Sequence, residues 1–358
     1  MTASKRIACL VMCVLCFMTA SFTASAEETT ALTSGEFSYE ILDDETICVT
    51  AYTGSGGEVT VPQEIDGKTV TALGDELFWY MEEVTAISLP ETLEYIGARV
   101  FQNCTSITEI KLPDSVTQID DACFLGCSSL SKINVPSSLV YVGAFAFDET
   151  PWITQFDGCS SIILGGRVFY KYLADEDMVV IPKDILCISD NAFDGKALSF
   201  VKIPDSVAFI GDYCFYNCPN LKEIKLPASV YYLGENSLGL ISGPSQIESV
   251  EGFVIYADES TLGADYAKKY EVTLKASAQF SEPQVLPEAE ECVPTAEIRT
   301  ADTSAPSPGL SHGSVVAIVL SIGGCVIVIG GITVASYFYE KNRKKQLKEN
   351  QNSKKKKK

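Results

Sequence analysis

The sequence holds a single histidine, His312, and none before it. Histidine is the commonest general base and a common zinc ligand, so its absence from the first 311 residues excludes most triad hydrolases and histidine-based metal sites there. We therefore expect no enzyme activity, no metal and no cofactor. A surface hydrolase that uses paired carboxylates is a less favoured alternative, because Asp120 and Asp121 stand at recurring turn positions that turn chemistry already explains.

Basic residues are also scarce, with 27 Lys and Arg against 47 Asp and Glu and a formal net charge of −20. Ten of the basic residues follow position 339, and two more lie within the first 26 residues. The chain between those ends carries 15 basic and 45 acidic residues. A surface this acidic repels phosphate backbones, so we expect no nucleic acid partner.

The two chain ends carry targeting signals. Lys5 and Arg6 precede an apolar run and then Ala24-Ser25-Ala26, which predicts a signal peptide over 1–26. Residues 314–339 contain no charge and are long enough for a transmembrane helix, and the basic tail 340–358 should stay in the cytoplasm. The ends predict a single-pass protein of the cell membrane with its N-terminus outside, at the cell surface.

Between these ends the sequence repeats itself. Prolines recur at intervals of 28, 23, 23, 46, 22 and 23 residues, and 46 is twice 23. They are Pro62, Pro90, Pro113, Pro136, Pro182, Pro204 and Pro227. Phenylalanines follow the same rhythm at Phe78, Phe101, Phe124, Phe147, Phe193 and Phe215. A fixed period of this length indicates a tandem array whose units bury a core only when stacked.

The units "ITEIKLPDSVTQIDDACFLGC" and "LSFVKIPDSVAFIGDYCFYNC" follow the template L-x-x-I-x-L-P-x-S-V-x-x-I-G-x-x-A-F-x-x-C. This template resembles the BspA-like class of leucine-rich repeats found on cell surfaces. The resemblance covers about residues 35–274 and includes an entry hairpin, a double-length insert that begins "ETPWITQF", and a closing unit. It implies an α/β repeat, mostly β: a leucine-rich-repeat solenoid with a concave parallel sheet, an N-terminal β-hairpin cap and one C-terminal transmembrane helix.

We accordingly expect a cap hairpin over 27–61, repeats over 62–275 and a disordered stalk over 276–313. The resemblance implies non-catalytic binding of a protein or glycan ligand outside the cell, as in adhesion to a host matrix protein or another cell surface. A surface receptor or scaffold for neighbouring membrane proteins is the alternative, with the basic tail meeting an intracellular partner.

The strands L-x-x-I-x-L should point their first, fourth and sixth residues inward, which leaves the residues between them on a concave ligand face. Basic and apolar side chains of this candidate site are Lys111, Lys132, Met178, Phe200, Lys202, Lys222 and Lys225. The other interpretation is that lysines only keep strands soluble and unpaired. Trp152 in the aromatic insert is a secondary candidate for an interface anchor, against the alternative that it covers a local hairpin.

Two cysteine pairs, Cys123 with Cys127 and Cys214 with Cys218, suggest a metal or redox site. Cys123 and Cys214 occupy a repeat column that alanine fills in other units, whereas Cys127 and Cys218 occupy the last template column, as Cys104 does. The two pairs lie four units apart, too far for one zinc site. We predict that these cysteines pack as small apolar groups in the core. A disulfide between Cys104 and Cys127 remains the alternative, because stacking places that column within reach.

Overall fold

The computed structural model describes residues 32–283. The predicted signal peptide 1–26, transmembrane helix 314–339 and tail 340–358, together with most of the predicted stalk, lie outside the described residues. Among residues 32–283, no helix is long and apolar enough to cross a membrane.

The described chain begins with the predicted hairpin. Strand β2 (Phe37–Ile41) pairs antiparallel with β3 (Ile47–Tyr52), and β1 (Leu32–Ser34) adds to its edge. Strand β3 then pairs parallel with β6 (Lys68–Leu73), while β5 (Glu64–Ile65) pairs antiparallel with β6. The hairpin therefore covers the N-terminal end of the parallel array, as the resemblance implies.

Each repeat unit forms one coil with two strands on opposite sides. The L-x-x-I-x-L segments form the outer row: β4 (Gly57–Thr60), β7 (Val84–Ser88), β9 (Glu109–Lys111), β11 (Lys132–Asn134), β15 (Met178–Val180), β17 (Phe200–Lys202), β19 (Glu223–Lys225), β23 (Val254–Tyr256) and β24 (Thr273–Lys275). The x-I-G segments form the inner row, which continues from β3 and β6 through β8 (Tyr95–Ile96), β10 (Gln118–Ile119), β12 (Tyr141–Val142), β14 (Val168–Tyr172), β16 (Cys187–Ile188), β18 (Phe209–Ile210) and β20 (Tyr232–Leu233).

Equivalent residues of neighbouring coils lie in parallel register. Ile110 pairs with Ile133 in the outer row, and Gln118 pairs with Tyr141 in the inner row. The proline after each outer strand has no N–H to continue the ladder, and its carbonyl accepts a turn hydrogen bond, as from Val116 N–H to Pro113 O at 3.1 Å. The period of about 23 residues is thus one complete coil, which confirms a mostly β solenoid.

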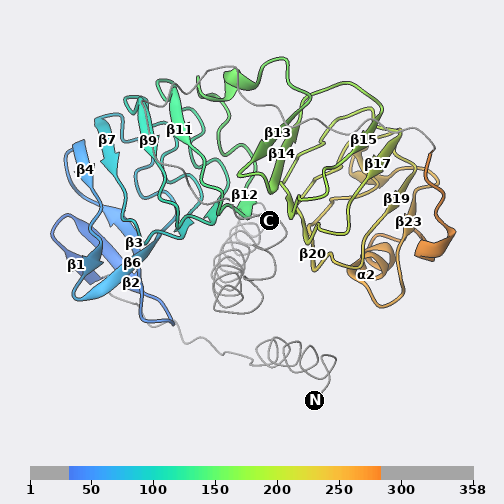
Figure 1. Ribbon diagram of the computed structural model, residues 1–358, viewed down its shortest axis with the longest axis horizontal. Coiled ribbons are helices and arrows are strands. Elements are labelled where there is room, and N and C mark those ends of the chain that lie inside the picture. Colours follow the sequence, from blue (N-terminus) through green and yellow to red (C-terminus); the bar gives the residue numbers. More distant parts are fainter. Residues whose placement is uncertain (1–31, 284–358) are drawn as a thin grey trace, which may run out of the picture. The chain divides into compact units, whose positions relative to one another are not determined.

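The inner row is the concave face of this solenoid. In Figure 1 the strands labelled β12 and β20 lie along the inner rim of the arch, whereas β4, β7, β9, β11, β15 and β17 follow the outer rim. The rings of Tyr141 and Phe209 meet at 5.1 Å although two coils lie between their strands. On a flat sheet three strand spacings would separate them by about 14 Å.

The expected concave sheet of L-x-x-I-x-L strands is therefore wrong in its position, although the strands themselves form as expected. The outer row is divided into separate sheets of two or three strands, while the inner row forms sheets of eight and five strands. Continuous hydrogen bonding keeps the inner strands close together, and the broken outer row accommodates the longer arc. Helix is also rarer than an α/β repeat implies, since α2 (Leu262–Lys269), in the closing unit, is the α-helix of the described residues.

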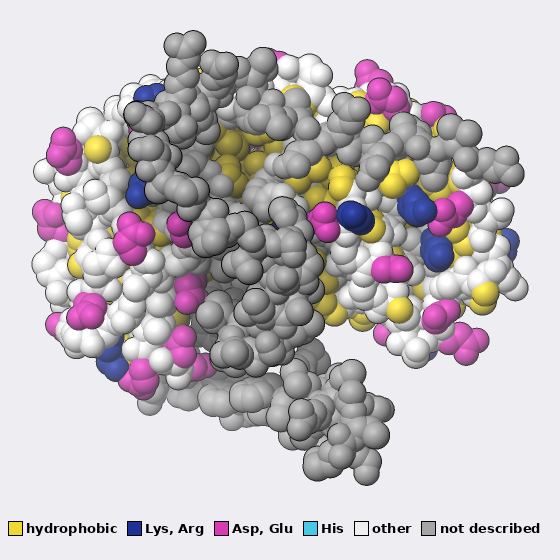
Figure 2. Space-filling view, viewed as in Figure 1, with side chains coloured by type: hydrophobic (Ala, Val, Ile, Leu, Met, Phe, Trp, Pro, Cys, Tyr) yellow, Lys and Arg dark blue, Asp and Glu magenta, His cyan; other side chains and the backbone are white. Residues whose placement is uncertain are grey.

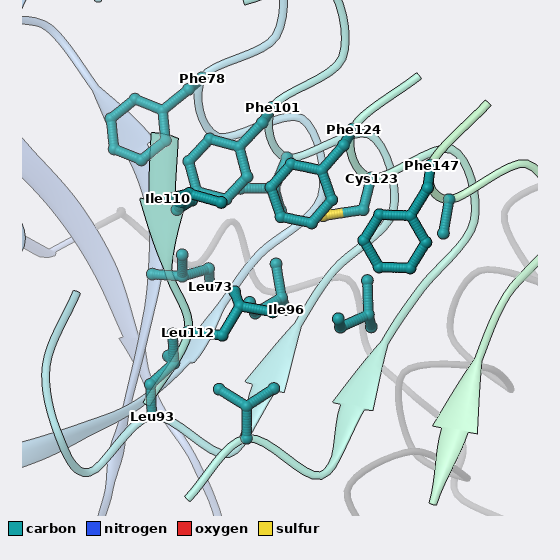
Figure 3. Close-up of a cluster of buried hydrophobic side chains, with 14 of the residues drawn as sticks. Leu73, Phe78, Leu93, Ile96, Phe101, Ile110, Leu112, Cys123, Phe124 and Phe147 are labelled. Carbon is teal, nitrogen blue, oxygen red and sulfur yellow. The ribbon is translucent and has the colours of Figure 1, made fainter. Parts of the chain in front are cut away.

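The repeated phenylalanines stack inside the solenoid. In the N-terminal coils Phe78, Phe101, Phe124 and Phe147 follow one another with ring centroids 5.2–5.5 Å apart and nearly parallel planes (Figure 3). In the C-terminal coils Phe169, Phe193 and Phe215 do the same at 5.0 and 4.7 Å. Burying each ring is worth about 1.5–3 kcal/mol, so the ladder couples every coil to the next.

The glycine of the template has a steric cause. The Asp75 Oδ1 accepts a hydrogen bond from Ala98 N–H at 3.0 Å in the next coil, and a Cβ on Gly97 would lie 2.7 Å from the same oxygen. The same pairing recurs at Asp121 with Gly143, Asp190 with Gly211 and Asp212 with Gly234. Where a coil has alanine in the aspartate column, at Ala98, the next coil has Asp120 in place of glycine. The aspartates thus accept backbone hydrogen bonds from the neighbouring coil.

The double-length insert divides the core into two clusters of buried side chains. A short 3₁₀ turn (η1, Ile153–Phe156) leads into an antiparallel hairpin of β13 (Ser161–Leu164) and β14. Tyr170 in this hairpin belongs to the N-terminal cluster, where its ring meets Phe147 at 5.8 Å and its hydroxyl accepts a hydrogen bond from Phe147 N–H at 3.3 Å. The residue before it, Phe169, belongs to the C-terminal cluster, so β14 contributes side chains to both. A second hairpin, β21 (Leu240–Ser242) with β22 (Ile247–Ser249), precedes the closing unit.

Candidate ligand-binding surface

The seven residues of the candidate ligand face all belong to the segments that form the outer row. Because that row lies on the outer rim, they do not line a concave face. The insert also separates them: β9 and β11 form one sheet, β15 and β17 another, and β19, β23 and β24 a third. The structure therefore divides the predicted site into an N-terminal group, Lys111 and Lys132, and a C-terminal group of five residues.

The N-terminal group is open to solvent. Lys132 Nζ lies 3.4 Å from Glu109 Oε2, and their side chains are 73% and 64% exposed. An exposed pair of this kind contributes about 0.2–1 kcal/mol at most. Lys111 borders a shallow pocket of about 180 Å³ with Ser88 and Glu91. This surface is polar and presents no aromatic side chain on β7, β9 or β11.

Two members of the C-terminal group, Phe200 and Lys202, are covered by the chain itself. Phe200 is only 4% exposed, because the ring of Phe280 stacks on it with centroids 5.9 Å apart. Lys202 Nζ is 2.8 Å from Glu282 Oε2. The expectation that Phe200 is a free apolar anchor is therefore wrong, and so is a stalk that leaves the repeats at residue 276, because Phe280 and Glu282 lie against β17.

Two further groups complete this covered surface. Tyr256 meets Phe280 edge-on at 5.0 Å, and Lys275 Nζ lies 5.6 Å from the centre of the Tyr256 ring. A shallow pocket of about 210 Å³ is bordered by Lys202, Lys225, Phe280 and Glu282 among others. Figure 2 shows basic side chains beside acidic and hydrophobic ones over the C-terminal coils.

The remaining members of the C-terminal group are less covered. Met178 is half-buried on β15, and Lys222 donates a hydrogen bond to Glu251 O at 3.3 Å. Sequence reasoning missed Tyr256, Phe280 and Glu282. The signal available for the last two was the isolated "QFSE" in an otherwise polar segment.

Trp152 is part of the core. Its ring is 5% exposed and packs on Phe147 at 4.8 Å and on Phe156 at 5.4 Å. Trp152 is therefore buried among core aromatics and is not available to a ligand.

The inner row carries a column of tyrosines bonded to aspartates, which sequence reasoning did not single out. Tyr95 donates its hydroxyl hydrogen bond to Asp120 and Tyr141 to Asp190, both at 2.8 Å. Burial raises the pKa of both phenols well above the usual range, and the neighbouring carboxylates add to the shift. The phenols therefore stay neutral and act as hydrogen-bond donors between coils.

The cysteines of the last template column are free thiols bonded to the coil before them. The Sγ of Cys104 lies 3.0 Å from Phe78 O, that of Cys127 2.9 Å from Phe101 O, and that of Cys218 3.1 Å from Phe193 O. Burial raises the pKa of all three thiols to about 12. Packing in the core is thus confirmed and a Cys104–Cys127 disulfide is excluded. Cys159, which sequence reasoning did not single out, is disulfide-bonded.

The repeat pattern matches a family model, that of the BspA type leucine rich repeat region, with six copies over residues 58–175 and 163–256. The chain belongs to this family. Membership supports a role as a repeat protein that binds other molecules, and such repeats are typically non-enzymatic. No curated protein matches the chain.

The BspA-type chain also resembles solved bacterial leucine-rich repeat structures. A T. pallidum leucine rich repeat protein is 24% identical over 63% of this chain and 80% of its own, with a TM-score of 0.32. A leucine-rich repeat protein from Bacteroides ovatus is 25% identical over 63% of this chain and 60% of its own, with a TM-score of 0.34. A leucine rich cell surface protein from Faecalibacterium prausnitzii is 18% identical over 73% and 97%, with a TM-score of 0.26. Because these TM-scores are low, the family assignment rests on the repeat pattern alone.

Proposed function

We propose that this protein is displayed on the cell surface and binds a protein or glycan ligand outside the cell, without catalysis, through its outer row. The observation that carries the proposal is the regular presentation of side chains there: residues one coil apart stand in parallel register, as Met178 does beside Phe200 and Val180 beside Lys202. Such a face can contact an extended partner at many points.

Charge supports the same surface. Lys111 and Lys225 have no acidic partner among the described residues, and both border the shallow pockets of the outer row. On a chain with a strong excess of acidic residues, these lysines form local sites for a negatively charged or hydrogen-bond-accepting ligand. A host matrix protein or another cell surface supplies such groups, and residues 314–339 would hold the chain in the membrane.

The test is adhesion of cells that express the full chain to immobilised matrix proteins, mucins and polysaccharides. We expect adhesion to at least one of them, and at least a tenfold loss in the triple variant Lys202→Glu, Lys222→Glu and Lys225→Glu. A control variant, Lys183→Glu with Lys268→Glu, also reverses exposed charges but lies off the outer row. Adhesion that is equal in all three chains would contradict the proposed surface.

The basic tail 340–358 favours a second candidate, a receptor or scaffold for neighbouring membrane proteins, because ten basic residues there offer a contact for an intracellular partner. This candidate predicts that partners co-purify with the full chain from membranes and are lost when residues 340–358 are deleted. Adhesion through the outer row would survive the same deletion, so one variant separates the two functions.

A further inference from the structure

The chain carries an aromatic residue and a carboxylate of its own onto the outer row. After β24 ends at Lys275, a 3₁₀ turn (η2, Ser277–Gln279) carries the chain back across the strands. The ring of Phe280 then meets both Phe200 on β17 and Tyr256 on β23, at 5.9 and 5.0 Å. Strand β19 lies between those two strands, so Phe280 spans it.

Glu282 reaches the same surface two residues later. Phe280 has extended backbone angles, and in extended backbone residues two apart point to the same side. Glu282 accordingly bonds Lys202 Nζ at 2.8 Å, on the strand that carries Phe200. Lys225 stands beside Lys202 in the next coil and borders the same pocket, so the site holds a second cation close to the bound carboxylate.

Side chains, rather than a backbone ladder, hold this segment in place. Within the described part of the chain, the backbone hydrogen bonds of the segment are internal: Gln279 N–H donates to Ala276 O at 2.9 Å and Phe280 N–H to Ser277 O at 3.2 Å. The Lys202 and Glu282 side chains remain 43% and 39% exposed. Such a contact can open without disturbing the hydrogen bonds of the coils.

We propose that the surface formed by Phe200, Lys202, Lys225 and Tyr256 is a docking site for an extended peptide with an aromatic side chain followed two positions later by a carboxylate. Phe280 and Glu282 are its tethered occupant, so a peptide in trans must displace them. This deepens the proposed function and rests on it, because it names the ligand class and the control of the same face. A tethered occupant acts at an effective concentration of about a millimolar, so it weakens the apparent affinity for any free peptide.

The N-terminal coils provide the matched comparison. There the positions equivalent to Phe200 and Lys202 are Ala86 and Ser88 on β7, and the pocket beside Lys111 has no aromatic wall. The N-terminal coils therefore have the same strand geometry without the aromatic clamp. If substitutions of Phe200 and Lys202 weaken peptide binding and a substitution of Lys132 does not, the site lies on the C-terminal coils.

The experiment titrates a fluorescent peptide of sequence ASAQFSEP, residues 276–283, into the full chain in lipid nanodiscs and follows anisotropy. We expect the variant Phe280→Ala with Glu282→Ala, whose own occupant is disabled, to bind the peptide at least tenfold more tightly than the wild type. Adding Lys202→Glu to that variant should abolish binding, whereas adding Lys132→Glu should leave it unchanged. A peptide with Phe280→Ala should not bind.

Two results would overturn the inference: no binding to the disabled variant, or binding that Lys202→Glu leaves intact. Hydrogen exchange of the inner-row strands in each variant checks that the coils remain folded. The adhesion assay on the same chains separates this inference from the proposed function. If the peptide fails to bind while adhesion still depends on Lys202, Lys222 and Lys225, the docking site is rejected and the adhesive surface stands.

Discussion

The N-terminal and C-terminal coils share one interior and differ in their outer surface. Both have a stacked phenylalanine ladder and the aspartate–glycine pairing between coils. On the outer row the N-terminal coils expose a lysine–glutamate pair, while the C-terminal coils hold Phe280 against Phe200 and Tyr256. Inward positions are held alike by stacking, because each must fit the coil on either side. Outward positions have no such constraint and can acquire a site in one half alone.

The largest expected effect comes from the shared interior. Phe124→Ala and Phe193→Ala each remove an internal ring of a ladder, and each should cost about 3–5 kcal/mol of unfolding free energy. Because the insert divides the buried side chains into two clusters, each variant should lose hydrogen-exchange protection mainly in its own half. Hydrogen exchange with mass spectrometry on the full chain measures this. Equal loss in both halves after either substitution would show that the insert does not divide the solenoid.

A smaller effect should follow from crowding the glycine column. Gly97→Ala places a Cβ 2.7 Å from Asp75 Oδ1 and 2.9 Å from Leu73 O, so the coils must move apart, at a cost of about 1–3 kcal/mol. Asp75→Ala removes the nearer contact and the hydrogen bond that draws the coils together. The double variant should therefore be less destabilised than the sum of the single ones, as denaturant unfolding would reveal. Additive costs would reject the pairing of the two columns.

Charge reversal should distinguish the two outer surfaces. Lys132→Glu breaks an exposed pair and should change stability by less than about 1 kcal/mol. Lys202→Glu should have a similarly small effect on overall stability, but it places two carboxylates together at Glu282 and should release residues 277–282. Limited proteolysis of the full chain would detect faster cleavage in that segment for Lys202→Glu only. Equal cleavage in both variants would mean that the ion pair does not hold the segment.

The smallest effect is expected from the thiols, which both halves share. With pKa values raised to about 12 by burial, Cys104, Cys127 and Cys218 should not react with iodoacetamide at pH 8 in the folded chain. After unfolding without reductant they should all react, whereas Cys159 should not. Since a free thiol ionises near pH 8.5 and these do not, the stability of the fold should fall as pH rises from about 8.5 toward 12. Intact mass measurement counts the labels. If both Cys104 and Cys127 stayed unlabelled in the unfolded chain, they would not be free thiols.

Much of the interior followed from the sequence because stacking repeats the same contact every 23 residues or so. The spacing of Phe78, Phe101 and Phe124 predicts a column, and a column of apolar residues in stacked coils must be buried together. The cysteine pairs were explained by the same columns. The interruption of the period located the insert, but the sequence left Trp152 open as an interface anchor, and its burial against Phe147 emerged only from the structure.

The site was less predictable, for two physical reasons. The curvature of the solenoid comes from a small difference in strand spacing between the inner and outer rows, summed over many coils. The template of a single coil therefore does not say which row is concave. The cover over Phe200 comes from a contact between Lys202 and Glu282, 80 residues apart, which no period encodes. The sequence alone thus determined the coil, its period and its buried columns, since these depend on neighbours one repeat away. Only the tertiary structure decided which face is concave and which part of the outer row is covered by Phe280 and Glu282, because both depend on where distant segments meet in space.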